Sequence, residues 1–359
     1  MAPQYAVPQV RLPFMAAPSM TGAVRRGQWA GADEMVGFCA NTPPPTLAPH
    51  TAKFWVGGSR RDLFVAVVSG TPPGGKLLAR ANPMPTGTNA ATSLDDAVEI
   101  FVDPSPRAAN GEIYQAIINA KGAIWQQAYQ SRGGGAPAWH GHWRITSKVA
   151  GNRWSLEIAV PWRDFGIHNI VGRTVGIQVC RDWKQIPADQ DQWYYSQWSP
   201  LGGDFTNPAT MPLVTWNPRA PVVQTLQLQD KPDRPAHIKI SVRNPLATPL
   251  KIRASVVVVP QNSRPTTQTQ TLALAPHEVK MISLRPAAMS DEPIYTHIEV
   301  GSADGKTIFY QRGFQWKINR PRQLWALNRH AARRIDTQFA YYPSYHVMRV
   351  RVSLSGLYV

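Results

Sequence analysis

Cysteine, acidic residues and long apolar runs are all scarce in this chain of 359 residues. The two cysteines, Cys39 and Cys180, fall within strand-like runs, so they could form one disulfide or stay as two buried thiols. Two cysteines cannot build a metal site by themselves. No stretch approaches the roughly 18 apolar residues that a membrane-spanning helix needs, so we expect no membrane span.

The shortage of acidic residues leaves 22 of them against 38 basic ones, a formal net charge of +16. The excess is uneven, because residues 218–359 hold 20 of the basic residues and only 8 of the acidic ones. The basic residues are scattered, without a basic helix, zinc-ligand spacing or an RNA-binding aromatic motif. The sequence therefore argues against specific nucleic-acid binding and favours, at most, weak attraction to acidic polymers or anionic surfaces.

Proline (33 residues), glycine (26) and tryptophan (13) are abundant. Such a mixture is typical of many short strands joined by turns, and we expect an all-β fold. Runs with strand-like alternation form two groups, one before and one after residue 217. The first comprises 51–56, 63–68, 97–103, 114–120, 124–129, 143–149, 154–160 and 175–180. The second comprises 236–243, 252–259, 268–274, 280–284, 295–302 and 307–314.

The segment 217–221, Asn-Pro-Arg-Ala-Pro, is typical of a stiff linker between the two groups. We expect an antiparallel β-sandwich over residues 12–217 and a smaller immunoglobulin-like β-sandwich over 220–319. The two should fold separately and share no sheet. Residues 322–359 are expected to be a connector and the start of an incomplete further domain.

Polar side chains recur on the strand faces that point away from the predicted core. Alternation places Glu99, Glu157 and Gln178 opposite apolar neighbours, and Asn119 shares a face with Gln115. Carboxylates and amides match the hydroxyls of a sugar, and aromatic rings can stack on its C–H faces. Candidate rings are Trp125, Trp139, Trp143, Trp183, Trp193, Trp198 and Phe205.

Several motifs follow one another in an order that is similar to a known family. They include Gly27-Gln-Trp-Ala-Gly-Ala32, Asp95-Asp-Ala-Val-Glu-Ile-Phe-Val-Asp-Pro104, Ile118-Asn-Ala-Lys-Gly122, Trp154-Ser-Leu-Glu-Ile-Ala-Val-Pro161 and Gln197-Trp-Ser-Pro200. Over about residues 12–217 the chain resembles the family 9 carbohydrate-binding modules. This resemblance implies a β-sandwich that binds glucose- or xylose-type sugars without catalysis and is often attached to xylanases and other glycoside hydrolases.

The resemblance also implies a set of site residues. Glu99 and Gln178 match positions that hydrogen-bond the sugar in the family. Three positions depart from the pattern: Ser93 and Phe205 stand where tryptophans stack on the sugar, and Ile117 stands where an arginine reaches it. Phe205 is then the surviving ring, and we add Asn119 and Trp198 as further candidates for sugar contact.

The sequence also allows a catalytic site or a metal site as alternatives to sugar binding. Glu99 and Glu157 could form a glycosidase-like carboxylate pair. Asp95 and Asp96 could help to hold a structural calcium, and His140 with His142 could touch a metal. No other cofactor is expected.

Two further alternatives lie outside enzymology. Related sandwiches elsewhere bind haem, for which Met84 and His168 are available as axial ligands. The chain could also be a structural or adhesive module of a cell-envelope protein, without sugar binding. Residues 1–18 are broken by four prolines and lack the basic start of a signal peptide, yet the expected glycan partner favours an extracellular or cell-envelope location.

Overall fold

The computed structural model is built almost entirely of β-strands, which confirms the all-β expectation. Two short 3-10 helices, η1 (Ala90–Leu94) and η2 (Trp162–Phe165), interrupt the strands. The structure describes residues 6–40, 46–48, 52–72, 76–85, 87–106, 108, 111–130, 139–184, 194–199, 210–229, 236–260, 264–286, 293–316, 335–342 and 347–354.

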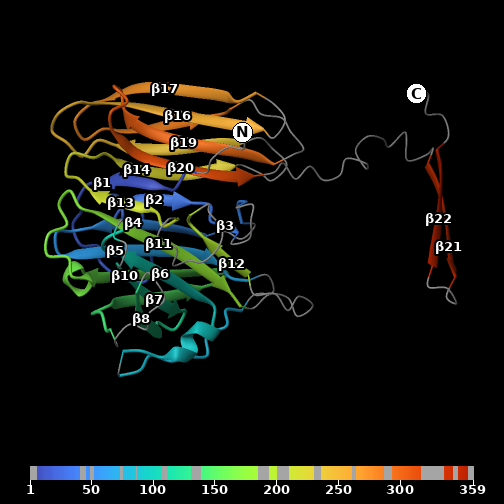
Figure 1. Ribbon diagram of the computed structural model, residues 1–359, viewed down its shortest axis with the longest axis horizontal. Helices are drawn as coiled ribbons and strands as arrows, with labels where there is room; N and C mark the ends of the chain where they lie inside the picture. Colours follow the sequence, from blue (N-terminus) through green and yellow to red (C-terminus); the bar gives the residue numbers. More distant parts are fainter. Residues whose placement is uncertain are drawn as a thin grey trace.

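Two large sheets form the main body (Figure 1). The 12-stranded sheet has the order β17-β16-β19-β20-β1-β13-β11-β6-β7-β8, with β12 beside β11 and β3 beside β12. Its strands are β1 (Gln9–Leu12), β3 (Cys39–Ala40), β6 (Ala97–Asp103), β7 (Glu112–Asn119), β8 (Ile124–Gln130), β11 (Thr174–Trp183), β12 (Tyr194–Gln197), β13 (Leu213–Trp216), β16 (Leu250–Pro260), β17 (Thr266–Leu274), β19 (Ile294–Ser302) and β20 (Ile308–Trp316).

The 8-stranded sheet has the order β18-β15-β14-β2-β4-β5-β10-β9. Its strands are β2 (Asp33–Val36), β4 (Ala52–Gly58), β5 (Asp62–Gly70), β9 (Arg144–Ala150), β10 (Arg153–Pro161), β14 (Val222–Gln229), β15 (Ala236–Arg243) and β18 (Val279–Leu284). A separate antiparallel pair is formed by β21 (Ile335–Tyr342) and β22 (Val347–Leu354), within the stretch expected to begin a further domain.

Alternating apolar residues explain how the sheets pack. Val98, Ile100 and Val102 of β6 enter the same buried cluster as Leu156 and Ile158 of β10. Because successive side chains point to opposite faces, the residues between them point away from this core. The alternation read from the sequence is confirmed here, and it leaves the polar residues of β6 and β11 on the outer face of the 12-stranded sheet.

The expectation that residues 12–217 and 220–319 would share no sheet is wrong. β1 pairs with β13 on one side and with β20 on the other, and β14 pairs in parallel with β2 at Gln224 and Glu34. One buried cluster runs from Val10 through Trp216 to Trp316. Both sheets and the core therefore continue across the proline-rich segment at 217–221, where the sequence alone predicts a boundary.

Cys39 and Cys180 are both buried, free thiols, so of the two alternatives the disulfide is wrong. Burial raises the pKa of both thiols, and the neighbouring charges of Glu99 and Asp182 raise that of Cys180 further. Among the described residues, no helix is long and apolar enough to cross a membrane.

Candidate functional site

The outer face of the 12-stranded sheet brings the predicted polar residues of β6, β7 and β11 together. Glu99 lies opposite Cys180 and Ile117, and Phe101 lies opposite Gln178 and Gln115. Glu99 and Gln178 thus share one face, as expected, but they are only 7% and 1% exposed. The site that they define is recessed rather than open.

Hydrogen bonds tie these side chains into two groups. Gln115 donates from Nε2 to Glu99 Oε2 over 2.7 Å, and its own Oε1 accepts from Gln127 Nε2 at 2.7 Å and from the Tyr129 hydroxyl. Gln178 donates to Gln197 over 3.2 Å and accepts from the backbone N–H of Ser199 at 3.2 Å. The hydrogen bonds of the Glu99 group extend towards β8, whereas both ends of the Gln178 amide bond to other residues of the protein.

A row of side chains on β8 completes this face. Trp125 lies opposite Ile117, Gln127 opposite Gln115, and Tyr129 opposite Ile113. All three β8 residues are half-buried, and β8 is the last strand of its sheet. Sequence reasoning included Trp125 among seven aromatic candidates but missed Gln127 and Tyr129, although the alternation of 125, 127 and 129 was visible. This row is the most accessible part of the face, and we call Trp125, Gln127 and Tyr129 the β8 row.

Asp182 was also missed, and it forms a buried carboxyl pair with Glu99. Burial raises the pKa of both groups, and the charge of Asp182 raises that of Glu99 further. Among the described residues, no N–H group donates to either oxygen of Asp182, and the hydrogen-bonding partner of its carboxyl group is the Glu99 carboxyl. One proton held by Glu99 and donated to Asp182 satisfies both carboxyls, whereas two charges at this depth would repel each other.

Asn119 has a structural role that leaves its amide no spare capacity. Its Nδ2 donates to the Ala81 carbonyl and to Asp95, at 2.9 and 2.8 Å. Its Oδ1 accepts from the backbone N–H groups of Lys121 and Ala123, both at 3.0 Å. The prediction that Asn119 contacts sugar is therefore wrong for this arrangement, since the side chain ties η1's flanking loop to the β7–β8 turn.

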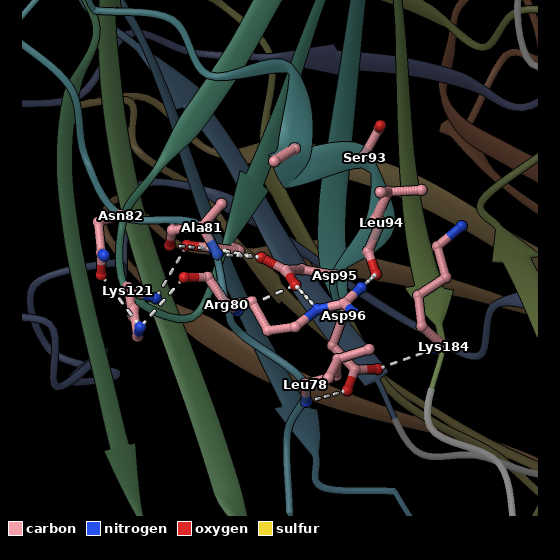
Figure 2. Close-up of polar contacts among 12 residues, drawn as sticks. Leu78, Arg80, Ala81, Asn82, Ser93, Leu94, Asp95, Asp96, Lys121 and Lys184 are labelled. Carbon is pink, nitrogen blue, oxygen red and sulfur yellow. Dashed lines mark hydrogen bonds and ion pairs between the residues drawn. The ribbon is translucent and has the colours of Figure 1, made fainter.

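Asp95 and Asp96 face N–H donors, as Figure 2 shows. Asp95 accepts from the backbone of Arg80 and Ala81, each at 2.9 Å. Asp96 accepts from Leu78 and Lys184 at 2.6 and 3.1 Å, besides its ion pair with Arg181.

Calcium requires six to eight oxygen ligands, so carboxylates already surrounded by N–H groups do not fit it. Among the described residues, no group of three or more histidines, cysteines or acidic residues could hold a metal ion. His142 instead lies 3.2 Å from Asp164.

The remaining predicted rings and contacts are dispersed. Trp198 is fully buried in the core with its ring edge against Phe54, at a centroid distance of 5.1 Å, so the prediction that it stacks on sugar is wrong. Phe205 and Trp193 lie outside the described residues. Ser93 donates its hydroxyl to the Ala90 carbonyl within η1, and Ile117 is 3% exposed beside Glu99, its partner on the neighbouring strand.

The catalytic pairing of Glu99 with Glu157 is wrong as well. Glu157 belongs to β10 in the other sheet, where its carboxylate accepts from Trp29 Nε1 at 2.9 Å and from the backbone of Thr21 and Gly22. The two carboxylates lie on the outer faces of different sheets, with the core between them. Met84 and His168, the haem-ligand candidates, are both exposed.

No protein-family model matches this sequence, and no curated protein sequence matches it either. The chain is similar to a solved family 9 carbohydrate-binding module from Caldicellulosiruptor kristjanssonii in complex with glucose. The identity is 14% and the TM-score 0.42, over 58% of this chain and 95% of that one. For the same module in complex with cellotriose, the identity is 14% and the TM-score 0.42, over 59% of this chain and 95% of that one. For a β-glucuronidase from Bacteroides uniformis, the identity is 10% and the TM-score 0.21, over 79% of this chain and 27% of the enzyme. These likenesses concern the fold.

Proposed function

We propose that the outer face of β6, β7 and β8 binds a neutral oligosaccharide or polysaccharide without catalysing a reaction. The β8 row carries the proposal. It offers an aromatic ring, an amide and a phenol at alternate positions of one edge strand, and Gln115 joins the last two to Glu99. The order of motifs that resembles family 9 modules supports the same reading.

Each group has a distinct part in recognition. Trp125 would stack on the C–H face of a sugar ring, while Gln127 and Tyr129 would exchange hydrogen bonds with its hydroxyls. Gln115 is a positioning residue, because its amide bonds to Glu99, Gln127 and Tyr129 fix their orientation. Glu99 accepts the hydrogen bond of Gln115 from the neighbouring strand, and this supporting role replaces the direct sugar contact expected from the sequence.

The protein would then serve as the glycan-binding part of a larger, exported, glycan-associated protein. A second function has one specific observation in its favour. The burial of Glu99 and Gln178, together with the internal partners of Gln178, also suits a structural or adhesive module of the cell envelope. That module would use the same sandwich without binding sugar.

Calorimetry of the full chain against xylan, cellulose and mannan oligosaccharides separates the two functions. Trp125→Ala should weaken sugar binding about tenfold or more, since an aromatic contact and its buried area are lost together. Gln127→Ala should weaken binding by a smaller factor. Gln270→Ala is the matched control, because Gln270 is an exposed glutamine on β17, at the far end of the same sheet.

Binding that survives Trp125→Ala and Gln127→Ala unchanged would place the sugar elsewhere on the protein. If none of the oligosaccharides binds at millimolar concentration while the protein is folded, the structural or adhesive function replaces this proposal.

A further inference from the structure

A groove lies on the outer face of the 8-stranded sheet, whereas the β8 row belongs to the 12-stranded sheet. It has a volume of about 420 Å³ and lies over β14, β15 and β18. The lining residues that matter for binding are Arg26, Gly27, Gln224, Ser241, Arg243 and Met281. No part of the sugar site proposed above contributes to it, so the two can be tested independently.

Strand register determines the floor of the groove. Gln224, Ser241 and Met281 form one cross-strand row, and Val222, Arg243 and Val279 form the next. Amide, hydroxyl and guanidinium groups therefore line the centre, where hydrogen bonds can be both donated and accepted. The side of the groove on β18 is apolar, because Val279 and Met281 are 55% and 57% exposed.

The opposite wall is the turn at residues 25–31, which is firmly anchored. Trp29 within it is fully buried and donates to Glu157 over 2.9 Å. Gln224 Nε2 donates to the carbonyl of Ala32, at the end of the turn, over 3.0 Å. The wall thus stands in place before any ligand arrives, so binding does not need to order it.

The charges around the groove are mostly positive. Arg26 on the wall is 62% exposed and forms an ion pair with Glu34, which also pairs with Lys53. Among the described residues, Arg243 Nε is buried and has no hydrogen-bond acceptor. Further basic residues on the same side are Arg25 in the turn, Lys239 on β15 and Arg285 just beyond β18.

We propose that this groove is a second saccharide site, which binds a carboxylate-bearing sugar of the uronic acid class. The sugar carboxylate meets the guanidinium groups of Arg26 and Arg243, since planar guanidinium and carboxylate groups match each other in geometry. The ring hydroxyls meet Gln224 and Ser241. The C–H face of the ring lies against Met281 and Val279.

Calorimetry of the full chain with trigalacturonate, at low and at physiological salt, tests the proposal. A neutral galactose trisaccharide is the uncharged control, and poly-L-glutamate and a short DNA duplex report attraction to negative charge alone. We expect trigalacturonate to bind at least about tenfold more tightly than each of the three, with an affinity that falls as salt rises.

Two variants act on the groove by different means. Arg243→Gln removes a charge, and Gly27→Phe fills the opening, where a Cβ atom would meet no atom within 4 Å. Each should weaken trigalacturonate binding about tenfold or more. Lys280→Gln removes the same charge from the opposite side of β18 and should leave binding within about twofold. Circular dichroism confirms that each variant is folded.

Three results would overturn the proposal. They are equal affinity for the neutral trisaccharide, equal affinity for poly-L-glutamate or DNA, and binding that neither groove variant changes. Trp125→Ala should not alter trigalacturonate binding, so the outcome here is separate from that at the β8 row.

Discussion

Replacing Arg181 by methionine should lower the free energy of unfolding by about 3–5 kcal/mol, the usual loss when one partner of a buried ion pair is removed. The guanidinium is fully buried between the rings of Trp154 and Trp183, at 4.9 and 4.1 Å from their centroids. It joins the two sheets, because it forms an ion pair with Asp96 at 3.3 Å and donates to Ser69 of β5 over 3.1 Å. Burial lowers the pKa of Arg181 to about 10, so it stays charged at neutral pH.

Two features set the magnitude. After the replacement, Asp96 still accepts hydrogen bonds from the backbone N–H groups of Leu78 and Lys184. The carboxylate is then only partly unpaired, which limits the loss of stability. The two indole rings also lose a desolvated cation, a contact that contributes about 2 kcal/mol. Methionine fills much of the space, so the cavity itself adds little.

Urea denaturation of Arg181→Met, Asp96→Asn and the double variant measures the coupling between the two charges. The double variant should be more stable than Arg181→Met alone, since no unpaired carboxylate remains. Arg144→Met is the matched control, because it breaks the exposed pair of Arg144 with Asp62 and should cost about 0–1 kcal/mol. A loss below about 1 kcal/mol in Arg181→Met would refute the view that this buried pair holds the sheets together.

Three further predictions concern other parts of the molecule. Glu99→Gln should stabilise the protein more at about pH 8 than at about pH 4. The pKa of Glu99 is raised in the folded state, whereas the unfolded chain releases this proton above about pH 4.3, so the native glutamate costs stability as the pH rises. Glutamine removes that cost. Thermal unfolding at both pH values checks this, and an equal shift at both contradicts it. Asn119→Ala should cost about 3 kcal/mol by leaving several buried groups unpaired, against less than about 1 for the exposed Asn169→Ala, as urea denaturation can show. Leu12→Ala should cost about 2–5 kcal/mol and lower hydrogen-exchange protection in β5 and β16 together, whereas Leu94→Ala, at a residue 49% exposed, should do neither.

Most strands of five or more residues were predictable from their alternation. Each of the predicted runs overlaps a strand of the structure, from β4 at Ala52–Gly58 to β20 at Ile308–Trp316. β1, β2, β3, β12 and β13 were missed, because two to four residues cannot display a period of two. The eight-residue strands β14 (Val222–Gln229) and β21 (Ile335–Tyr342) were missed as well. Of the missed strands, β1, β2 and β14 join the two expected sandwiches, since β1 pairs with β20 and β2 pairs with β14. The error in the boundary therefore follows from the error in these strands.

The site was predictable in orientation but not in depth. Alternation placed Glu99 and Gln178 on the outer face correctly, since that depends only on strand parity. Whether an outward residue is open or engaged depends on neighbours far away in the sequence, as Asn119 with Asp95 and Ala81 shows. Trp198 could not be placed either, because it follows directly after β12, and the sequence did not reveal that strand.

The position of β1 has a consequence for the order in which the protein can be made. Gln9 lies opposite Gln311, so this pair cannot form until the ribosome has synthesised the chain past β20. Before that, β1 keeps one unpaired backbone edge, and β2 keeps one until β14 has been synthesised. Neighbouring chains can add to edges of this kind. Pairings across such sequence distances also form slowly. Nascent chains that stall before β14 and β20 have been synthesised should therefore be exposed to aggregation, and a chaperone that covers strand edges should raise the yield more than one that covers apolar side chains.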